Sequence, residues 1–204
     1  MQVFTKLLTS AIILLAAMAT TGCIGSSSSE PTRYYTLAVE NISTPESSAK
    51  GSVQVRKFTI DPAYQRANIV YRESAYDFMF YDLDLWASRP DHMVTQVVAE
   101  YAVKSGLFET VEIKGNSKPA FEISGNISAI EEVDEGSSQY ARLAIEISFR
   151  KVDSGAPLFE KRYDDRAPMD KREPRFMAEA TSKLLAKFME DALAGISGAN
   201  QPQE

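Results

Sequence analysis

Few residues in this chain are of types that could perform catalysis. His92 is the only histidine and Cys23 the only cysteine. Nucleophilic catalysis needs a base held beside the nucleophile, and the sequence identifies no such partner for His92. A zinc site needs more ligands than the chain supplies, and the sequence has no glycine-rich phosphate loop or dinucleotide fingerprint. We therefore interpret His92 as structural or solvated, and we find no positive sign of an enzyme, a metal site or a cofactor.

Two groups of carboxylates are the other candidates for chemistry. Asp82 and Asp84 stand at i and i+2 of a predicted strand, so their side chains would point the same way. An acid–base pair also needs environments that separate the two pKa values, and nothing nearby provides them. The acidic segment 131–136 marks a turn and lacks the ligand spacing of a calcium loop. We interpret both groups as solvated carboxylates in loops and turns.

The first half of the chain is rich in tyrosine, and it holds the single tryptophan. Such side chains are favoured where one end is buried and the other meets water, as at interaction surfaces. The alternative is that each is an ordinary strand aromatic. From this pattern we predict an interaction surface that contains Tyr34, Tyr35, Tyr71, Arg72, Tyr76, Tyr81 and Trp86.

The hydrophobic period changes from two to about 3.6 at residues 86–90, which separates a strand region from a helix. Before this point, residues 69–74 and 76–81 are dense in aromatic and β-branched side chains. They predict two strands joined by a tight turn at Ser74-Ala75. Apolar and polar side chains exchange faces at Tyr81-Asp82, so the second strand either leaves the sheet there or has an edge bulge.

After this point an amphipathic helix is predicted. Pro90 suits the first helical turn, Ser88 is the candidate N-cap, and Asp91 favours the positive helix end. Gly106 provides the left-handed residue that stops the helix. The stripe predicted to be buried against a sheet consists of Met93, Val94, Val97, Val98 and Tyr101.

The remaining segments continue a pattern of strands with one further helix. Strands are predicted at residues 33–39, 52–60, 108–113, 119–130, 143–150 and 157–163, and a helix at 174–193. The alternation slips between Val55 and Phe58, which predicts a bulge near Arg56-Lys57. The last three strands are expected to form an antiparallel meander. The fold class is α+β, a two-layer domain in which a largely antiparallel or mixed sheet packs against two main helices.

The N-terminus has the features of a secretory signal. Lys6 precedes the apolar run 7–17, which is too short for a membrane-spanning helix, and small residues lead to Cys23. The alternatives are an uncleaved anchor, or an ordinary cleaved signal that leaves a free thiol. The expected organisation is a signal peptide at 1–22, a lipidated N-terminus with a flexible tether at 23–32, a folded domain at 33–197 and a polar tail at 198–204.

Charge excludes several kinds of partner. Removal of residues 1–22 takes away Lys6 and no acid, so 21 basic and 28 acidic residues leave a net charge of −7. Nucleic-acid binding rests on clustered lysine and arginine, so no nucleic-acid partner is expected. The same charge argues against electrostatic adsorption to anionic lipid and leaves acyl chains on Cys23 as the attachment.

These segments together resemble a known family. The Gly22-Cys23 pair is similar to a bacterial lipobox, in which the thiol is acylated. The matching positions that follow, in order, are Tyr34-Tyr35-Thr36-Leu37, Ile69-Val70-Tyr71-Arg72, Tyr76, Phe80-Tyr81, Trp86-Ala87, Pro90, Met93 and Gly106-Leu107-Phe108. In this order they resemble the ABC-type transport auxiliary lipoproteins, which include the paraquat-inducible protein C group.

The resemblance implies a non-enzymatic lipoprotein of a lipid-transport system that pairs an ABC transporter with an MCE-domain protein. Acylated Cys23, followed by Ile24, would attach the chain to the outer membrane, facing the periplasm. The predicted surface would dock the MCE assembly or support a homo-oligomer. A structural envelope lipoprotein and a direct lipid-binding carrier remain as alternatives.

Overall fold

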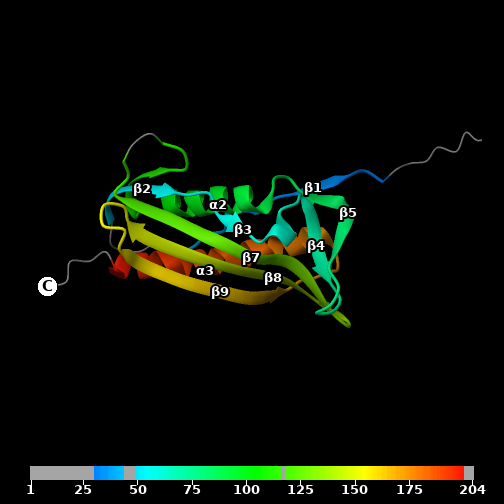
Figure 1. Ribbon diagram of the computed structural model, residues 1–204. Coiled ribbons are helices and arrows are strands. Elements are labelled where there is room, and N and C mark those ends of the chain that lie inside the picture. Colours follow the sequence, from blue (N-terminus) through cyan, green and yellow to red (C-terminus); the bar gives the residue numbers. More distant parts are fainter. Residues whose placement is uncertain (1–29, 44–48, 116–117, 200–204) are drawn as a thin grey trace, which may run out of the picture. The chain divides into compact units, whose positions relative to one another are not determined.

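The computed structural model describes residues 30–43, 49–115 and 118–199, so the predicted signal peptide and Cys23 lie outside the described residues. The strands and helices belong to one compact unit that starts at Thr32 (Figure 1). The elements are β1 (Arg33–Tyr35), β2 (Ala49–Val55), β3 (Thr59–Ile60), η1 (Pro62–Tyr64), β4 (Asn68–Arg72), β5 (Met79–Trp86), α2 (Pro90–Lys104), β6 (Phe108–Glu112), β7 (Phe121–Glu135), β8 (Ser138–Lys151), β9 (Pro157–Pro168) and α3 (Pro174–Ala199).

The strands form one mixed sheet that is organised around β7. On one side, β8 pairs antiparallel along the whole of β7, and β9 pairs antiparallel with β8. On the other side, β2, β3 and β4 pair with successive parts of β7, all parallel. Beyond these, β6 joins β2, β5 joins β4 and β1 joins β5. The predicted α+β class and the antiparallel meander are confirmed.

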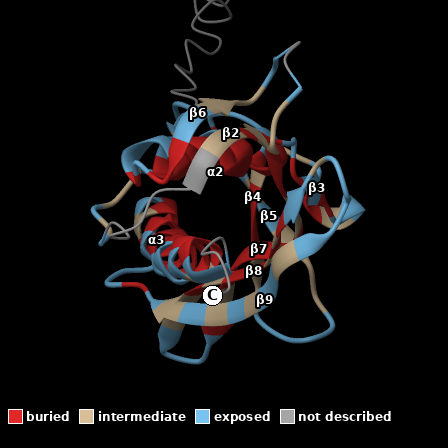
Figure 2. Cartoon of the chain, turned by 90° about the vertical axis from the view of Figure 1, so that its left-hand side faces the viewer, coloured by how far each residue is buried: buried red, intermediate tan, exposed pale blue. Residues whose placement is uncertain are grey.

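The two helices lie on the inner side of this curved sheet (Figure 2). Every residue of the predicted stripe on α2, from Met93 to Tyr101, is buried. On β8 the alternating side chains Leu143, Ile145, Ile147 and Phe149 are buried as well. Burial of each such side chain contributes about 1.5–3 kcal/mol relative to exposure. The predicted core faces of the helix and of this strand are therefore confirmed.

The helix ends differ in detail from the prediction. Arg89, not Ser88, is the N-cap of α2, and its side chain makes no capping hydrogen bond. Gly106 has φ +63°, as a helix-stopping glycine requires. Helix α3 continues beyond residue 193 to Ala199, because Ile196 and Ser197 are still buried against the domain. The helix is therefore longer than its polar C-terminal composition predicted.

The predicted bulge near Arg56-Lys57 divides one strand into β2 and β3. Val55 pairs with Ile123 and Thr59 pairs with Asn126, so four residue steps on one side match three on β7. The extra residue returns Phe58 to the buried face, where its amide donates to Thr95 Oγ1 at 3.0 Å.

The predicted hairpin is formed by β4 and β5, which pair antiparallel. Its second strand does not leave the sheet at Tyr81-Asp82. It continues to Trp86, because β1 pairs with its last three residues. The register is irregular between the Asn68–Leu85 pair and the Val70–Phe80 pair. An edge bulge therefore explains the exchange of faces.

Candidate interaction surface

His92 lies in the first turn of α2, beside an ion-pair cluster. Its Nε2 atom is 3.9 Å from Asp91 Oδ2, and that carboxylate is already paired with Lys57 at 2.8 Å and Arg89 at 3.0 Å. Burial opposes the charge of Asp91, but hydrogen bonds from the two cations outweigh burial and lower its pKa. In the described ranges no group of three or more histidine, cysteine or acidic side chains could hold a metal. The cluster binds the start of α2 to the bulge between β2 and β3.

Asp82 and Asp84 lie in different environments. Asp82 is exposed, whereas Asp84 is only 6% exposed. Asp84 Oδ1 accepts hydrogen bonds from Arg33 Nε at 2.9 Å and from the Tyr35 hydroxyl at 2.8 Å. The prediction of two solvated loop carboxylates is wrong for Asp84, because β1 brings both donors to it from a distant part of the chain.

The predicted surface residues belong to β1 and to the β4–β5 hairpin, but their exposure differs widely. Tyr34 is 65% exposed and Tyr76 is 100% exposed. Trp86 is 2% exposed and belongs to the core, so its prediction as a surface residue is wrong. The other predicted members, Tyr35, Tyr71, Arg72 and Tyr81, are partly buried. Phe80, which was not predicted, is 39% exposed. We use the name aromatic edge for Phe80, Tyr34 and Tyr76, the exposed aromatic side chains of β1 and the β4–β5 hairpin.

Tyr76 is presented on a hydrogen-bonded turn. The Asp77 carboxylate accepts the amide protons of Glu73 at 3.0 Å and of Ser74 at 2.9 Å, and the Ser74 hydroxyl at 2.7 Å. These bonds, led by the one from the Ser74 side chain, lower the pKa of Asp77. The Tyr76 amide donates to Ser74 Oγ at 3.2 Å. The turn is therefore ordered by its own side chains while the Tyr76 ring points into solvent.

On the outer face of the hairpin, aromatic rings alternate with arginines. Phe78 lies between Tyr64 and Phe80, with ring centroids 5.4 Å and 6.0 Å away. The guanidinium of Arg72 is 4.7 Å from the Phe78 ring, and that of Arg66 is 4.3 Å from the Phe80 ring. Cation–π contacts of this kind favour a fixed ring orientation. Phe80 is thus held in place although it is partly exposed.

The same face buries Glu131. The side chain of Glu131 is fully buried and accepts from the Tyr64 hydroxyl at 2.5 Å, Arg72 Nε at 2.6 Å and Arg142 Nη1 at 2.9 Å. Burial and the hydrogen bond to Glu131 raise the pKa of Tyr64 to about 12. Two guanidiniums and a hydroxyl compensate one carboxylate, which is the condition for keeping a charge in the interior.

The inner face buries a second set of acids, which is less well compensated. Glu132 is fully buried, and the Tyr81 hydroxyl lies 3.2 Å from both of its oxygens. Asp134 is 6% exposed and pairs with Arg172, which also contacts Glu73 at 3.1 Å. Burial, and then the neighbouring Asp134 carboxylate, raise the pKa of Glu132 to about 7. Burial likewise raises the pKa of Asp134.

The prediction of a solvated turn at residues 131–136 is therefore wrong for Glu131, Glu132 and Asp134, which are buried, whereas Glu135 is exposed. Strand β7 includes residues 131–135, and the turn comes at Gly136, which has φ +64°. Gly136 is the sequence signal from which the position of these acids in β7 could have been predicted. A glycine in the left-handed conformation favours a tight hairpin turn, so both flanking strands can continue up to it. The partners of the acids could not be found this way, since they come from other elements.

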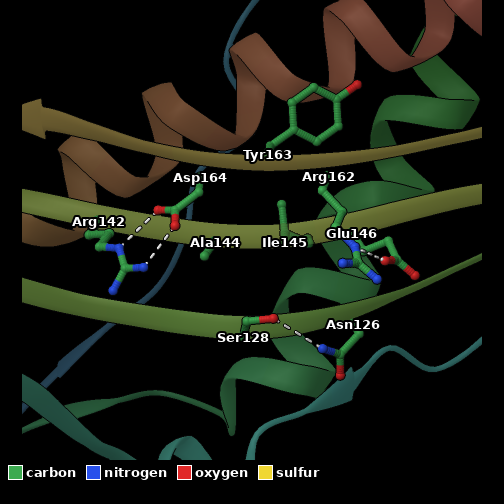
Figure 3. Close-up of a pocket in the computed structure, with 9 residues that line it drawn as sticks. All are labelled: Asn126, Ser128, Arg142, Ala144, Ile145, Glu146, Arg162, Tyr163 and Asp164. Carbon is green, nitrogen blue, oxygen red and sulfur yellow. Dashed lines mark hydrogen bonds and ion pairs between the residues drawn. The ribbon is translucent and has the colours of Figure 1, made fainter.

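A groove crosses the outer face of β7, β8 and β9 (Figure 3). Its volume is ≈ 480 Å³. Arg142 pairs with Asp164 at one end, and Arg162 pairs with Glu146 at the other. Ser128, the extra residue of a bulge in β7, accepts a hydrogen bond from Asn126 at 3.2 Å between them. The charged side chains of the groove neutralise one another.

In the described residues no helix is long and apolar enough to cross a membrane. The arrangement defines an α+β domain with exposed aromatic side chains on β1 and the β4–β5 hairpin. The family model described as "ABC-type transport auxiliary lipoprotein component" matches residues 35–192. The chain therefore belongs to the family of ABC-type transport auxiliary lipoprotein components, as the sequence resemblance predicted.

Solved structures with the same fold have little sequence in common with this chain. Protein XCC0632 from Xanthomonas campestris has a TM-score of 0.73 at 14% identity, over 83% of this chain and 97% of its own. A hypothetical protein from Chlamydia trachomatis has a TM-score of 0.51 at 8% identity, over 76% of this chain and 100% of its own. A search of curated proteins finds no match. At these identities the structures support the fold alone.

Proposed function

We propose that this chain is a non-enzymatic, periplasm-facing lipoprotein of an MCE and ABC-type lipid-transport system. Acyl chains on Cys23 would hold it at the outer membrane, and the folded domain would dock the MCE assembly that is anchored in the inner membrane. The observation that supports this proposal is the family match over residues 35–192. Several acyl chains make a firm anchor, because each buried methylene contributes about 0.8 kcal/mol.

The test of this proposal is purification of the full-length chain from its native envelope, followed by mass spectrometry of its partners and of its N-terminal peptide. We expect an acylated Cys23 and an MCE-domain protein in the same sample. An acylated Cys23 without such a partner would favour the structural envelope lipoprotein. An unmodified thiol would contradict the lipid anchor.

We assign docking to the aromatic edge. Tyr76 and Tyr34 are the most exposed aromatic side chains of the described residues, and both are held on ordered elements. Rigid aromatic anchors of this kind dominate many protein interfaces. The variant Tyr34→Ala/Tyr76→Ala should lose capture of the MCE partner, whereas Val103→Ala, at a side chain that is 62% exposed on α2, should keep it. The same pair of variants, compared by mass in solution, tests self-association.

A direct lipid-binding role is the second candidate, and one groove favours it. The groove lies between α2 and β6, has a volume of ≈ 420 Å³, and is lined by Ala99, Val103, Val111 and Ile113 with a few polar neighbours. Lipid that co-purifies at about one molecule per chain, and that is lost in Val103→Asp, would support the carrier role. Purified protein without lipid would contradict it.

A further inference from the structure

The β4–β5 hairpin is joined to the rest of the domain by an acidic cluster that comes from four segments. Tyr81 of β5 reaches Glu132 of β7, and Asp134 follows two residues later on the same strand. Arg172, from the segment before α3, pairs with Asp134 and with Glu73 at the hairpin turn. The cluster therefore connects the base of the turn that carries Tyr76 to the central strand and to the start of α3.

Among the described residues, the side chains opposite Glu132 on the two neighbouring strands carry no charge. On β8 the residue opposite Glu132 is Ala141, and on β4 it is Tyr71, whose ring lies 4.8 Å from that of Tyr81. The charged groups that act on Glu132 are thus Asp134 and Arg172, and Glu73 acts on Asp134. Three carboxylates face a single guanidinium.

Arg172 pairs with only one oxygen of Asp134, Oδ2. Both carboxylate oxygens are buried, and within the part of the chain that the structure describes Oδ1 accepts no hydrogen bond. A buried, charged oxygen without a donor destabilises the folded state. A proton on Glu132 would supply the missing donor and would remove one of the excess negative charges.

We propose that Glu132 and Asp134 share one proton, and that this proton fastens the β4–β5 hairpin, with its exposed Tyr76, to the domain. Loss of the proton leaves two adjacent buried carboxylates with one arginine, so the hairpin opens more often. The raised pKa of Glu132, at about 7, agrees with this geometry. Because the hairpin carries the docking surface, the effect on partner binding rests on the proposed function.

Amide hydrogen exchange of the purified full-length mature protein tests the proposal without any partner. After correction for the intrinsic pH dependence of exchange, protection of the amides in 68–86 should fall roughly tenfold between pH 6 and pH 8. Amides of α2 at 93–101 serve as an internal reference and should not change. Protection of the hairpin that is equal at both pH values would overturn the proposal.

Two variants identify the titrating group. Glu132→Gln has no titrating proton but can still donate an N–H to Asp134, so its hairpin should stay protected at pH 8. Glu135→Gln, an exposed acid on the same strand, should respond to pH like the wild type. A pH response that persists unchanged in Glu132→Gln would also overturn the proposal. That result would assign the pH response to another group. If Glu132 had only a structural role, Glu132→Gln would change hairpin protection by the same factor at both pH values.

Capture of the MCE partner at the two pH values separates this inference from the proposed function. If docking uses the fastened hairpin, capture should fall from pH 6 to pH 8 in the wild type but not in Glu132→Gln. If no MCE partner is captured at either pH, the proposed function is contradicted. The exchange experiment is unaffected by that outcome, because it uses the protein without a partner. If the hairpin amides show the expected loss of protection at pH 8 but capture is equal at both pH values, the link between hairpin and docking is contradicted.

Discussion

The hydroxyl of Tyr81 lies 3.2 Å from both carboxylate oxygens of Glu132, although 51 residues separate them in the chain. Burial, together with the Glu132 carboxylate, raises the pKa of this tyrosine well above its ordinary value. Glu132 is fully buried, and among the described residues the Tyr81 hydroxyl is its hydrogen-bond donor. This contact joins the hairpin to the central strand.

Stability should depend on Glu132 between about pH 5 and pH 7. The pKa of Glu132 is raised from 4.5 to about 7, so the folded state holds a proton that the unfolded chain has already released. The free energy of unfolding therefore falls as pH rises through this window. Glu132→Gln should remove the fall and raise the free energy of unfolding at pH 8 by about 3 kcal/mol. Urea unfolding at pH 5, 6, 7 and 8 measures this, and parallel profiles for the two proteins would contradict it.

Trp86 and Tyr76 should respond in opposite ways to truncation. Trp86→Ala should lower the free energy of unfolding by about 3–5 kcal/mol, because its side chain is buried and a cavity would remain. Tyr76→Ala should leave stability unchanged, because its side chain is fully exposed. Chemical denaturation measures the free energy of unfolding of both variants. A large loss of stability in Tyr76→Ala would show that the ring packs on the domain.

Gly125 should be the glycine of the sheet that is least tolerant of alanine. A Cβ atom there would lie 2.2 Å from Cε1 of Phe58 and 2.2 Å from the backbone oxygen of Glu146, which cannot move cheaply. Overpacking of this kind costs about 1–3 kcal/mol, so Gly125→Ala should lower the melting temperature clearly. Gly198→Ala in α3, where a Cβ would meet nothing within 4 Å, is the matched control and should not lower it. Equal melting temperatures for the two variants would rule out the steric account.

Tyr64→Phe tests the compensation of Glu131. The change removes a donor at 2.5 Å from a fully buried carboxylate, and hydrogen bonds to charged groups contribute about 1.5–3 kcal/mol. We expect the free energy of unfolding to fall by an amount near the lower end of this range, because Arg72 and Arg142 remain bound to Glu131. Tyr71→Phe is the control. A difference of less than half a kcal/mol between the two variants, about the size of an ordinary surface substitution, would show that the arginines alone compensate the acid.

Local patterns in the sequence were sufficient for the type of most elements and for the buried faces of α2 and β8. The apolar period from Met93 to Tyr101 and the alternation from Leu143 to Phe149 predicted which side chains the core receives. The slip in hydrophobic alternation between Val55 and Phe58 predicted a bulge, and the pairing of β2 and β3 with β7 shows one there. These features follow from the geometry of a helix and of a strand, which depends on neighbours in the chain.

The environment of the acids was decided only by the tertiary structure. Asp84, Glu131 and Glu132 look like surface carboxylates in the sequence, because a pattern of polar residues carries no information about distant donors. Each is buried because another segment brings a tyrosine hydroxyl to it: Tyr35, Tyr64 and Tyr81, respectively. Desolvation and pairing depend on distance in space, so they arise only when the sheet has brought these strands together.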